Sequence, residues 1–149
     1  MGTLPRVASF RDLVVYRKAR EFSREIFLLT RSFPKEETYS LTDQVRRSSR
    51  AIGANLAEAW AKRRYEKHFI SKLTDADGEQ QETQHWIGIA LDCGYINAVQ
   101  AEQLVAKCQE LGRLLGGMIE RASTFWDDSK SLHESSPDYF TDDTDSLSH

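Results

Sequence analysis

The 149-residue chain has little of what interrupts helices or cross-links chains: three prolines, eight glycines and two cysteines. So little proline and glycine favours helix over sheet. Cys93 and Cys108 form no C-x-x-C motif, which argues against a disulfide framework or a zinc site, and we expect two buried free thiols. The chain also lacks an N-terminal signal pattern and any apolar run near the roughly 20 residues that span a bilayer, so we expect a cytoplasmic protein without membrane contact.

Positive charge is almost absent from the C-terminal end. Residues 127–149 hold seven acids against Lys130 alone, a net charge of -6, whereas residues 6–72 hold 16 bases against 8 acids, a net +8. One half of the protein therefore offers a positive field to an anionic partner. We expect an N-terminal extension over residues 1–8, one folded domain over 9–126, and a disordered acidic tail over 127–149, because the tail's Ser, Asp and Thr residues cannot form a core.

Apolar residues recur at helical spacing in four stretches, which predicts an all-α, antiparallel, up-and-down four-helix bundle. Ser9 is the expected N-cap of the first helix, which Pro34 ends, and Ser40 that of the second; Gly94 ends the third, and Asn97 caps the fourth. The expected core stripes are Val15, Ala19, Phe22, Ile26 and Leu29; Leu41, Val45, Ser49, Ile52, Leu56 and Ala59; Phe69, Leu73, Ala76, Gln80, Thr83, Ile87 and Ala90; and Ala101, Leu104, Cys108, Leu111, Leu115, Met118 and Ala122.

No pattern of catalytic residues stands out. Glu82 and His85 form one Glu-x-x-His pair, the spacing that di-iron bundles use, but a second copy of the motif is missing. We therefore expect a non-enzyme without metal or cofactor; a di-metal enzyme is the third alternative. Asn55, Glu58 and Glu82 are interpreted as a structural polar network that fixes helix register.

Two basic clusters are the best candidates for a binding site. Guanidinium groups and aromatic rings are what phosphates and unpaired bases of RNA bind, and Trp60, Tyr65 and His68 lie near the second cluster. Solvated helical faces, paired with Asp43, Glu58 and Glu66, are an equally weighted interpretation. The nucleic-acid candidates are Arg46, Arg47 and Arg50, and Lys62, Arg63, Arg64 and Lys67.

Three glycines interrupt the fourth stretch, at about 1 kcal/mol each relative to alanine. Gly112 and Gly116 share a helix face, so we expect another helix to approach closely there, inside the bundle or across a subunit boundary.

Several short motifs lie along roughly residues 10–122: Phe10, Asp12 and Leu13; Phe33 and Pro34; Tyr39, Leu41, Gln44, Val45, Arg46 and Arg47; Ile52, Asn55, Leu56, Ala57 and Glu58; Phe69, Leu73, Ala76 and Glu82; and Gly94, Tyr95 and Ile96. Together these motifs resemble the four-helix proteins encoded by intervening sequences in bacterial 23S rRNA genes. Ala59 and Trp60 depart from the family's usual glycine.

The resemblance implies a ring of subunits, a pentamer, without catalytic chemistry. The family is similar to accessory proteins of diversity-generating retroelements, which bind nucleic acid and a reverse transcriptase. Our first hypothesis is accordingly a homo-oligomer that binds RNA or DNA through the basic face of helices one and two. The second is a scaffold that docks a partner protein, for example a reverse transcriptase, without touching nucleic acid.

Overall fold

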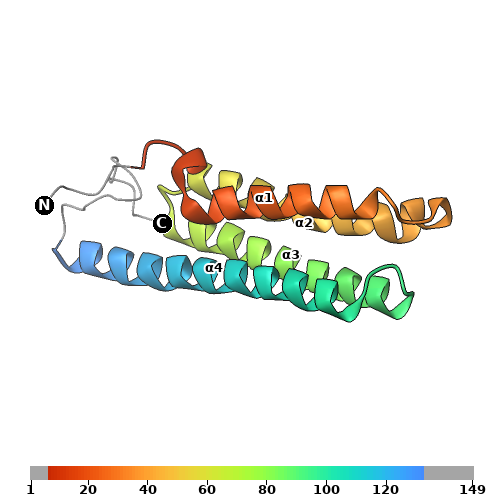
Figure 1. Ribbon diagram of the computed structural model, residues 1–149. Helices are drawn as coiled ribbons and strands as arrows, with labels where there is room; N and C mark the ends of the chain where they lie inside the picture. The colour runs from red at the N-terminus through yellow and green to blue at the C-terminus, as the bar shows by residue number, and fades with distance from the viewer. Residues whose placement is uncertain (1–6, 133–149) are drawn as a thin grey trace, which may run out of the picture.

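The computed structural model describes residues 7–132, and their side chains up to residue 122. This part of the chain is helical throughout, and successive long helices reverse direction (Figure 1). The long helices are α1 (Val14–Thr30), α2 (Asp43–Ala61), α3 (Glu66–Asp92) and α4 (Ala98–Leu132). Short helical turns, η1 (Phe10–Asp12), η2 (Lys35–Glu37) and η3 (Thr38–Thr42), precede α1 and α2. The four-helix fold predicted from the apolar spacing is confirmed.

The first helix starts in two steps. The Ser9 side chain accepts a hydrogen bond from the Arg11 amide at 3.1 Å, and the Asp12 carboxylate accepts one from the Ser9 amide at 3.2 Å. These bonds cap η1, but Leu13 is extended, so α1 begins only at Val14. Ser9 is therefore a cap, as predicted, of a separate turn that sets Arg11 beside α1.

The connection between α1 and α2 differs from the sequence prediction. α1 ends at Thr30, before Pro34, and the hydroxyl of Thr30 donates to the carbonyl of Ile26 at 2.8 Å. Ser40 is not an N-cap: it lies inside η3, a π-helical turn that leads directly into α2 at Asp43. Because η3 continues the helical backbone into α2, the first amides of α2 have backbone partners and need no side-chain cap.

The other connections follow the predicted signals. Gly94 has a φ of +79°, the left-handed conformation expected after the last turn of α3. The Asn97 side chain accepts from the Gln100 amide at 2.8 Å, and the Gln100 side chain accepts from the Asn97 amide at 2.9 Å, which together cap α4. At the same end of the bundle the Tyr95 hydroxyl donates to the Glu37 carboxylate at 2.7 Å, which raises the pKa of Tyr95 to about 12.

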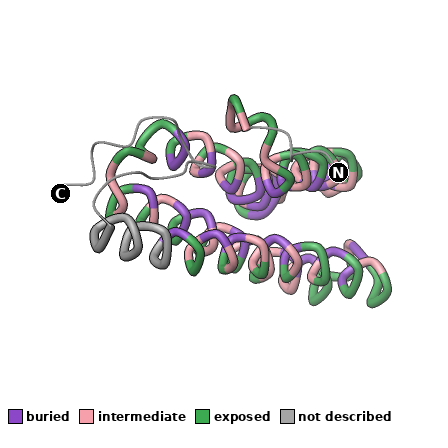
Figure 2. Tube along the Cα trace, turned by 90° about the vertical axis from the view of Figure 1, so that its left-hand side faces the viewer, coloured by how far each residue is buried: buried purple, intermediate pink, exposed green. Residues whose placement is uncertain are grey.

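The apolar stripes of the four helices meet in one core (Figure 2). Every predicted stripe residue is buried except Leu29, which packs against the core edge. Ser48 and Thr83 are also fully buried, and their hydroxyls bond each other at 2.7 Å between α2 and α3. Because each hydroxyl has a partner, this polar pair joins the two helices without an unsatisfied group.

The two cysteines differ in burial. Cys108 is buried, which raises the pKa of its thiol to about 12. Cys93 is exposed at the end of α3, so the prediction of two buried thiols is wrong for Cys93.

Two glycines of α4 differ in the space around them. A Cβ atom on Gly112 would lie 2.8 Å from Nε2 of Gln80 on α3, but one on Gly116 would meet nothing within 4 Å. Side chains of α3 therefore fill the space beside Gly112, whereas nothing within 4 Å fills the space beside Gly116.

α4 is longer than predicted. It continues to Leu132, past the boundary expected at Trp126, and the rest of the predicted disordered tail lies outside the described residues, as do residues 1–6 of the N-terminal extension. No helix in the described part of the chain is long and apolar enough to cross a membrane.

Candidate nucleic-acid interface

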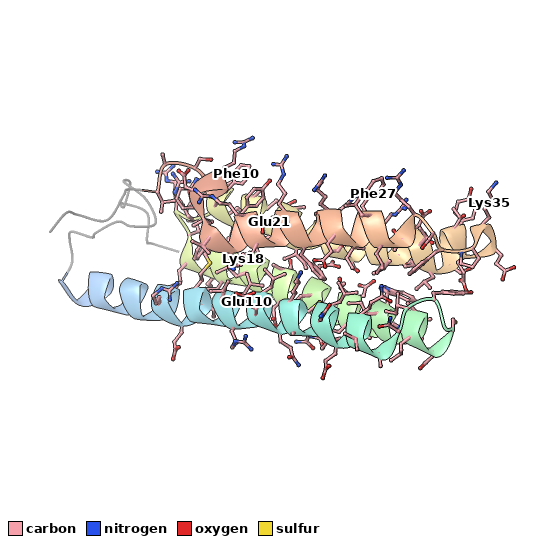
Figure 3. All side chains as sticks on the ribbon, viewed as in Figure 1. Phe10, Lys18, Glu21, Phe27, Lys35 and Glu110 are labelled. Atoms are coloured by element: carbon pink, nitrogen blue, oxygen red, sulfur yellow. The ribbon has the colours of Figure 1, made fainter. Side chains whose placement is uncertain are left out.

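Four arginines gather along one side of α1. Arg17, Arg20 and Arg24 are three and four residues apart, which places them on one helical face, and η1 adds Arg11 at the start of α1. Nitrogen-tipped side chains project from the side of α1 that points away from α3 and α4 (Figure 3). The local fold thus turns an arginine spacing of the sequence into a row of cations on the surface.

Between α1 and α2 this row borders a groove of about 620 Å³. Its lining comprises Arg11, Tyr16, Arg17, Arg20, Glu21, Ser23, Arg24, Phe27 and Arg50. A second hollow of about 250 Å³ adjoins it and shares Tyr16, Arg20, Ser23 and Arg50. We call these two hollows together the arginine groove. Five arginines face a single acid, Glu21, so the groove is strongly positive.

The groove arginines are oriented without being neutralised. Arg17 donates through Nε to the carbonyl of Arg11 at 3.2 Å, and Arg20 donates to the Tyr16 hydroxyl at 3.3 Å. Arg11 lies over the Phe10 ring, 4.5 Å from its centroid. Within residues 7–122, none of the five groove arginines forms an ion pair with a carboxylate. Their charge therefore remains available to a ligand.

Phe27 closes the far end of the groove. The guanidinium groups of Arg46, Arg50 and Arg31 lie 4.7, 5.7 and 6.0 Å from its ring centroid, within the range of cation–π attraction. Arg46 also donates to the Thr30 hydroxyl at 2.8 Å, which ties α2 to the end of α1. Of the first predicted cluster, Arg46 and Arg50 thus lie at the groove.

Arg47 lies elsewhere. Its guanidinium pairs with the Glu82 carboxylate of α3 at 3.0 Å, and the same carboxylate oxygen accepts from the Trp86 indole at 3.0 Å. The structure therefore separates Arg47 from Arg46 and Arg50, although the three are close in sequence.

The second predicted cluster occupies the turn between α2 and α3. The Arg63 guanidinium lies over the Trp60 ring, 4.2 Å from its centroid, and donates to the Trp60 carbonyl at 2.8 Å. This arginine therefore satisfies a carbonyl in the last turn of α2. Lys62, Arg64 and Lys67 are exposed. The turn lies at the end of the bundle where α1 begins (Figure 1), so these three residues lie at the same end as Arg11.

The three residues of the predicted polar network have separate partners. Asn55 donates to the carbonyl of Ala51 on its own helix at 2.9 Å. Glu58 pairs with Lys72 at 2.7 Å, a contact that lowers the pKa of Glu58 and raises that of Lys72. With Glu82 bonded to Arg47, both glutamates join α2 to α3, but at different points. Glu79, close to Glu82, is partly buried, and this desolvation raises the pKa of its carboxyl.

His85 is exposed beside the Trp86 ring, while the Glu82 carboxylate is engaged by Arg47 and Trp86. Across the described helices, no three His, Cys, Asp or Glu side chains gather in a way that would hold a metal ion. The Glu-x-x-His pair thus belongs to the contacts between α2 and α3.

Sequence reasoning missed Arg11, Arg17, Arg20 and Arg24 as site residues, counting them only in the net charge. The signal that identifies three of them is the spacing of Arg17, Arg20 and Arg24, which continues to Arg31 one heptad later and avoids the apolar stripe of the same helix.

Comparison with known proteins places this chain in a known family. The family model of the 23S rRNA-intervening sequence protein matches residues 11–117. A crystal structure of a protein with unknown function from the S23 ribosomal protein family, from Bacteroides thetaiotaomicron, is similar, with a TM-score of 0.65 and 31% sequence identity. That similarity covers 72% of this chain and 96% of the other. The comparison with curated proteins gives no match.

Proposed function

Within the 23S rRNA-intervening sequence protein family, to which this chain belongs, we propose that this member is a non-enzymatic protein that binds RNA in the arginine groove. One observation carries the proposal: five arginines line a single groove, and none of them forms an ion pair within residues 7–122. These available cations can attract RNA although the net charge of the whole chain is -3.

Guanidinium groups suit phosphate because their planar donors match two oxygens at once. Arg17 and Arg24 are one heptad apart, a rise of about 10 Å along α1, so the row spans more than one phosphate of a nucleic-acid strand. Tyr16 and Phe27 add aromatic rings to the lining of the same groove, against which unpaired bases can pack. Exposed Lys62 and Lys67 at the adjacent turn would extend the contact.

Assembly is the second part of the proposal. We propose a homo-oligomer, a pentamer by family resemblance, similar to the accessory proteins of diversity-generating retroelements. Light-scattering mass of the purified protein tests this part, and a monomer at micromolar concentration contradicts it.

Binding is measured best as a function of salt. The full chain is titrated into a fluorescein-labelled, unstructured 20-nucleotide RNA, and the anisotropy is followed from low to high salt. Because each phosphate contact with a single strand adds about 0.7 to the salt slope, replacing two contacting arginines should lower the slope by about 1.4. We expect this result, with weaker binding, for the double variant Arg20→Gln, Arg24→Gln.

A matched control removes two cations from the other side of α1 and from α4. Lys18 pairs with Glu110 at 3.2 Å and Lys107 with Glu25 at 2.6 Å, so Lys18→Gln, Lys107→Gln changes the net charge equally. We expect the control to keep both affinity and slope. Equal losses of RNA affinity in both variants would show that binding depends only on net charge. No binding at low salt would favour the protein-docking scaffold, which does not bind RNA or DNA.

A further inference from the structure

The sequence continues beyond α4 with an acidic segment. Residues 133–149 contain five acids and no lysine or arginine, and Tyr139 and Phe140 lie among the acids. The acids are Glu134, Asp138, Asp142, Asp143 and Asp145. This segment follows Leu132, the last residue of α4, so its attachment point is known from the structure.

The attachment point lies at the end of the bundle where α1 and its arginine row begin (Figure 1). The Lys18–Glu110 ion pair fixes the register between α1 and α4. Leu132 is about 22 residues beyond Glu110, or roughly 33 Å along the helix, while Arg11 precedes Lys18 by about 10 Å in the same direction if the rise of η1 is treated as helical. About 20 to 25 Å along the bundle axis thus separate Leu132 from the start of the groove.

The acidic segment is long enough to cover this distance. Ten residues lead from Leu132 to Asp142, and an extended chain spans at most about 33 to 36 Å over that number. The groove offers five cations without an ion-pair partner in residues 7–122, and the segment offers five carboxylates. Asp142, Asp143 and Asp145 follow Leu132 by ten or more residues and can therefore reach the start of the groove, whereas Glu134 and Asp138 follow it by only two and six residues.

We propose that residues 133–149 bind the arginine groove of their own chain and compete with RNA there. The competition rests on the proposed function, whereas the binding of the segment to the groove does not. Because a short tether gives an effective concentration in the millimolar range, even weak ionic contacts would occupy the groove within one chain. RNA must then displace the segment, and its affinity is lowered by the occupied fraction.

The first experiment uses full-length chains. Asp142→Asn, Asp143→Asn, Asp145→Asn neutralises the segment, and Glu36→Gln, Asp92→Asn, Glu102→Gln removes the same charge from exposed sites outside the groove lining. We expect the first variant to bind the 20-nucleotide RNA roughly tenfold more tightly at about 0.1 M salt, since the groove is freed. The control should change affinity about twofold or less, because salt screens distant charges. Equal affinity of the two variants overturns the competition.

The second experiment needs no RNA. A fluorescein-labelled synthetic peptide of residues 133–149 is titrated with the full-length segment-neutral variant, with and without Arg17→Gln, Arg20→Gln and Arg24→Gln. We expect an anisotropy increase that the arginine substitutions abolish. Peptide binding that survives these substitutions, or no binding at low salt, overturns the proposal. If the peptide binds and RNA does not, the segment's site stands and the proposed RNA function fails.

Binding to a second copy would be concentration dependent. The fold difference in RNA affinity between the full chain and the segment-neutral variant is therefore measured at two protein concentrations a hundredfold apart. A constant difference excludes binding between separate assemblies, and a light-scattering mass of one subunit then supports binding within one chain. A difference that grows with concentration, with a larger light-scattering mass, contradicts it.

Discussion

Arg17 and Lys18 are neighbours in the sequence, yet they belong to two surfaces with different chemistry. Lys18 faces α4, where Glu110 neutralises it, and Lys107 of α4 likewise pairs with Glu25 of α1. Arg17 lines the groove, where the one hydrogen bond of its guanidinium within residues 7–122 goes to the carbonyl of Arg11. α1 therefore carries neutralised charge on one flank and available charge on the other, which teaches that a binding surface is defined by missing counter-charges and not by the density of bases.

The largest effect is expected when the charge on the groove side of α1 is reversed. Arg17→Glu, Arg20→Glu, Arg24→Glu should weaken binding of the 20-nucleotide RNA by more than about 100-fold at low salt, because three contacts become repulsions. The helical content, measured by circular dichroism, should be preserved since no ion pair is lost. Loss of the fold would instead show that these arginines stabilise the bundle.

The contact between α3 and α4 contrasts with both sides of α1, because its stability depends on the size of the side chains there and not on their charge. Gly112→Val places a rigid side chain against Gln80, which hydrogen bonds to Asp77 and Gln84 hold in place. We expect the free energy of unfolding in urea to fall by about 1 to 3 kcal/mol. Gly116→Ala is the control, and it should raise stability by about 0.5 to 1 kcal/mol, since open space surrounds that Cβ. Equal effects would place Gly112 outside the close contact.

The neutralised flank should respond weakly. Lys107→Ala removes an exposed ion pair, so the free energy of unfolding should fall by about 0.2 to 1 kcal/mol, and by less at high salt. RNA affinity should not change. A drop in RNA affinity comparable to that of a groove arginine would end the distinction between the two flanks.

The smallest effect concerns the two thiols. Burial raises the pKa of Cys108 to about 12, so this thiol stays protonated at neutral pH, while Cys93 is exposed. A thiol reagent at pH 8 should modify one cysteine quickly in the native protein and both in urea. Cys93→Ser should abolish the fast reaction without changing stability or RNA binding. Fast modification of that variant would show that the core around Cys108 opens.

Most of the fold was predictable because burial follows local spacing. The stripe from Ala101 to Ala122 needed only the pattern of threes and fours, and Gly94 and Asn97 needed only their own backbone chemistry. Ser40 was misread because a helical turn upstream made a side-chain cap unnecessary. Local signals thus predict elements well, and fail where a neighbouring element supplies the same hydrogen bonds.

The candidate site was less predictable because ion pairing is long range. Arg47 is neutralised by Glu82, 35 positions away, and Lys18 by Glu110, 92 positions away. The sequence alone, without the packing of the helices, does not show that Arg47 is paired and Arg20 is available for binding. The arginine spacing on α1 was visible, but only the structure shows that no described carboxylate forms an ion pair with these arginines.

The central claim is that RNA occupies the groove between α1 and α2. Photo-cross-linking of the full-length protein to 4-thiouridine RNA, followed by mass spectrometry of the peptides, tests it most directly. The account predicts cross-links at Tyr16 and Phe27 that disappear in Arg17→Glu, Arg20→Glu, Arg24→Glu. Cross-links confined to α3 and α4, or unchanged by this variant, would contradict it.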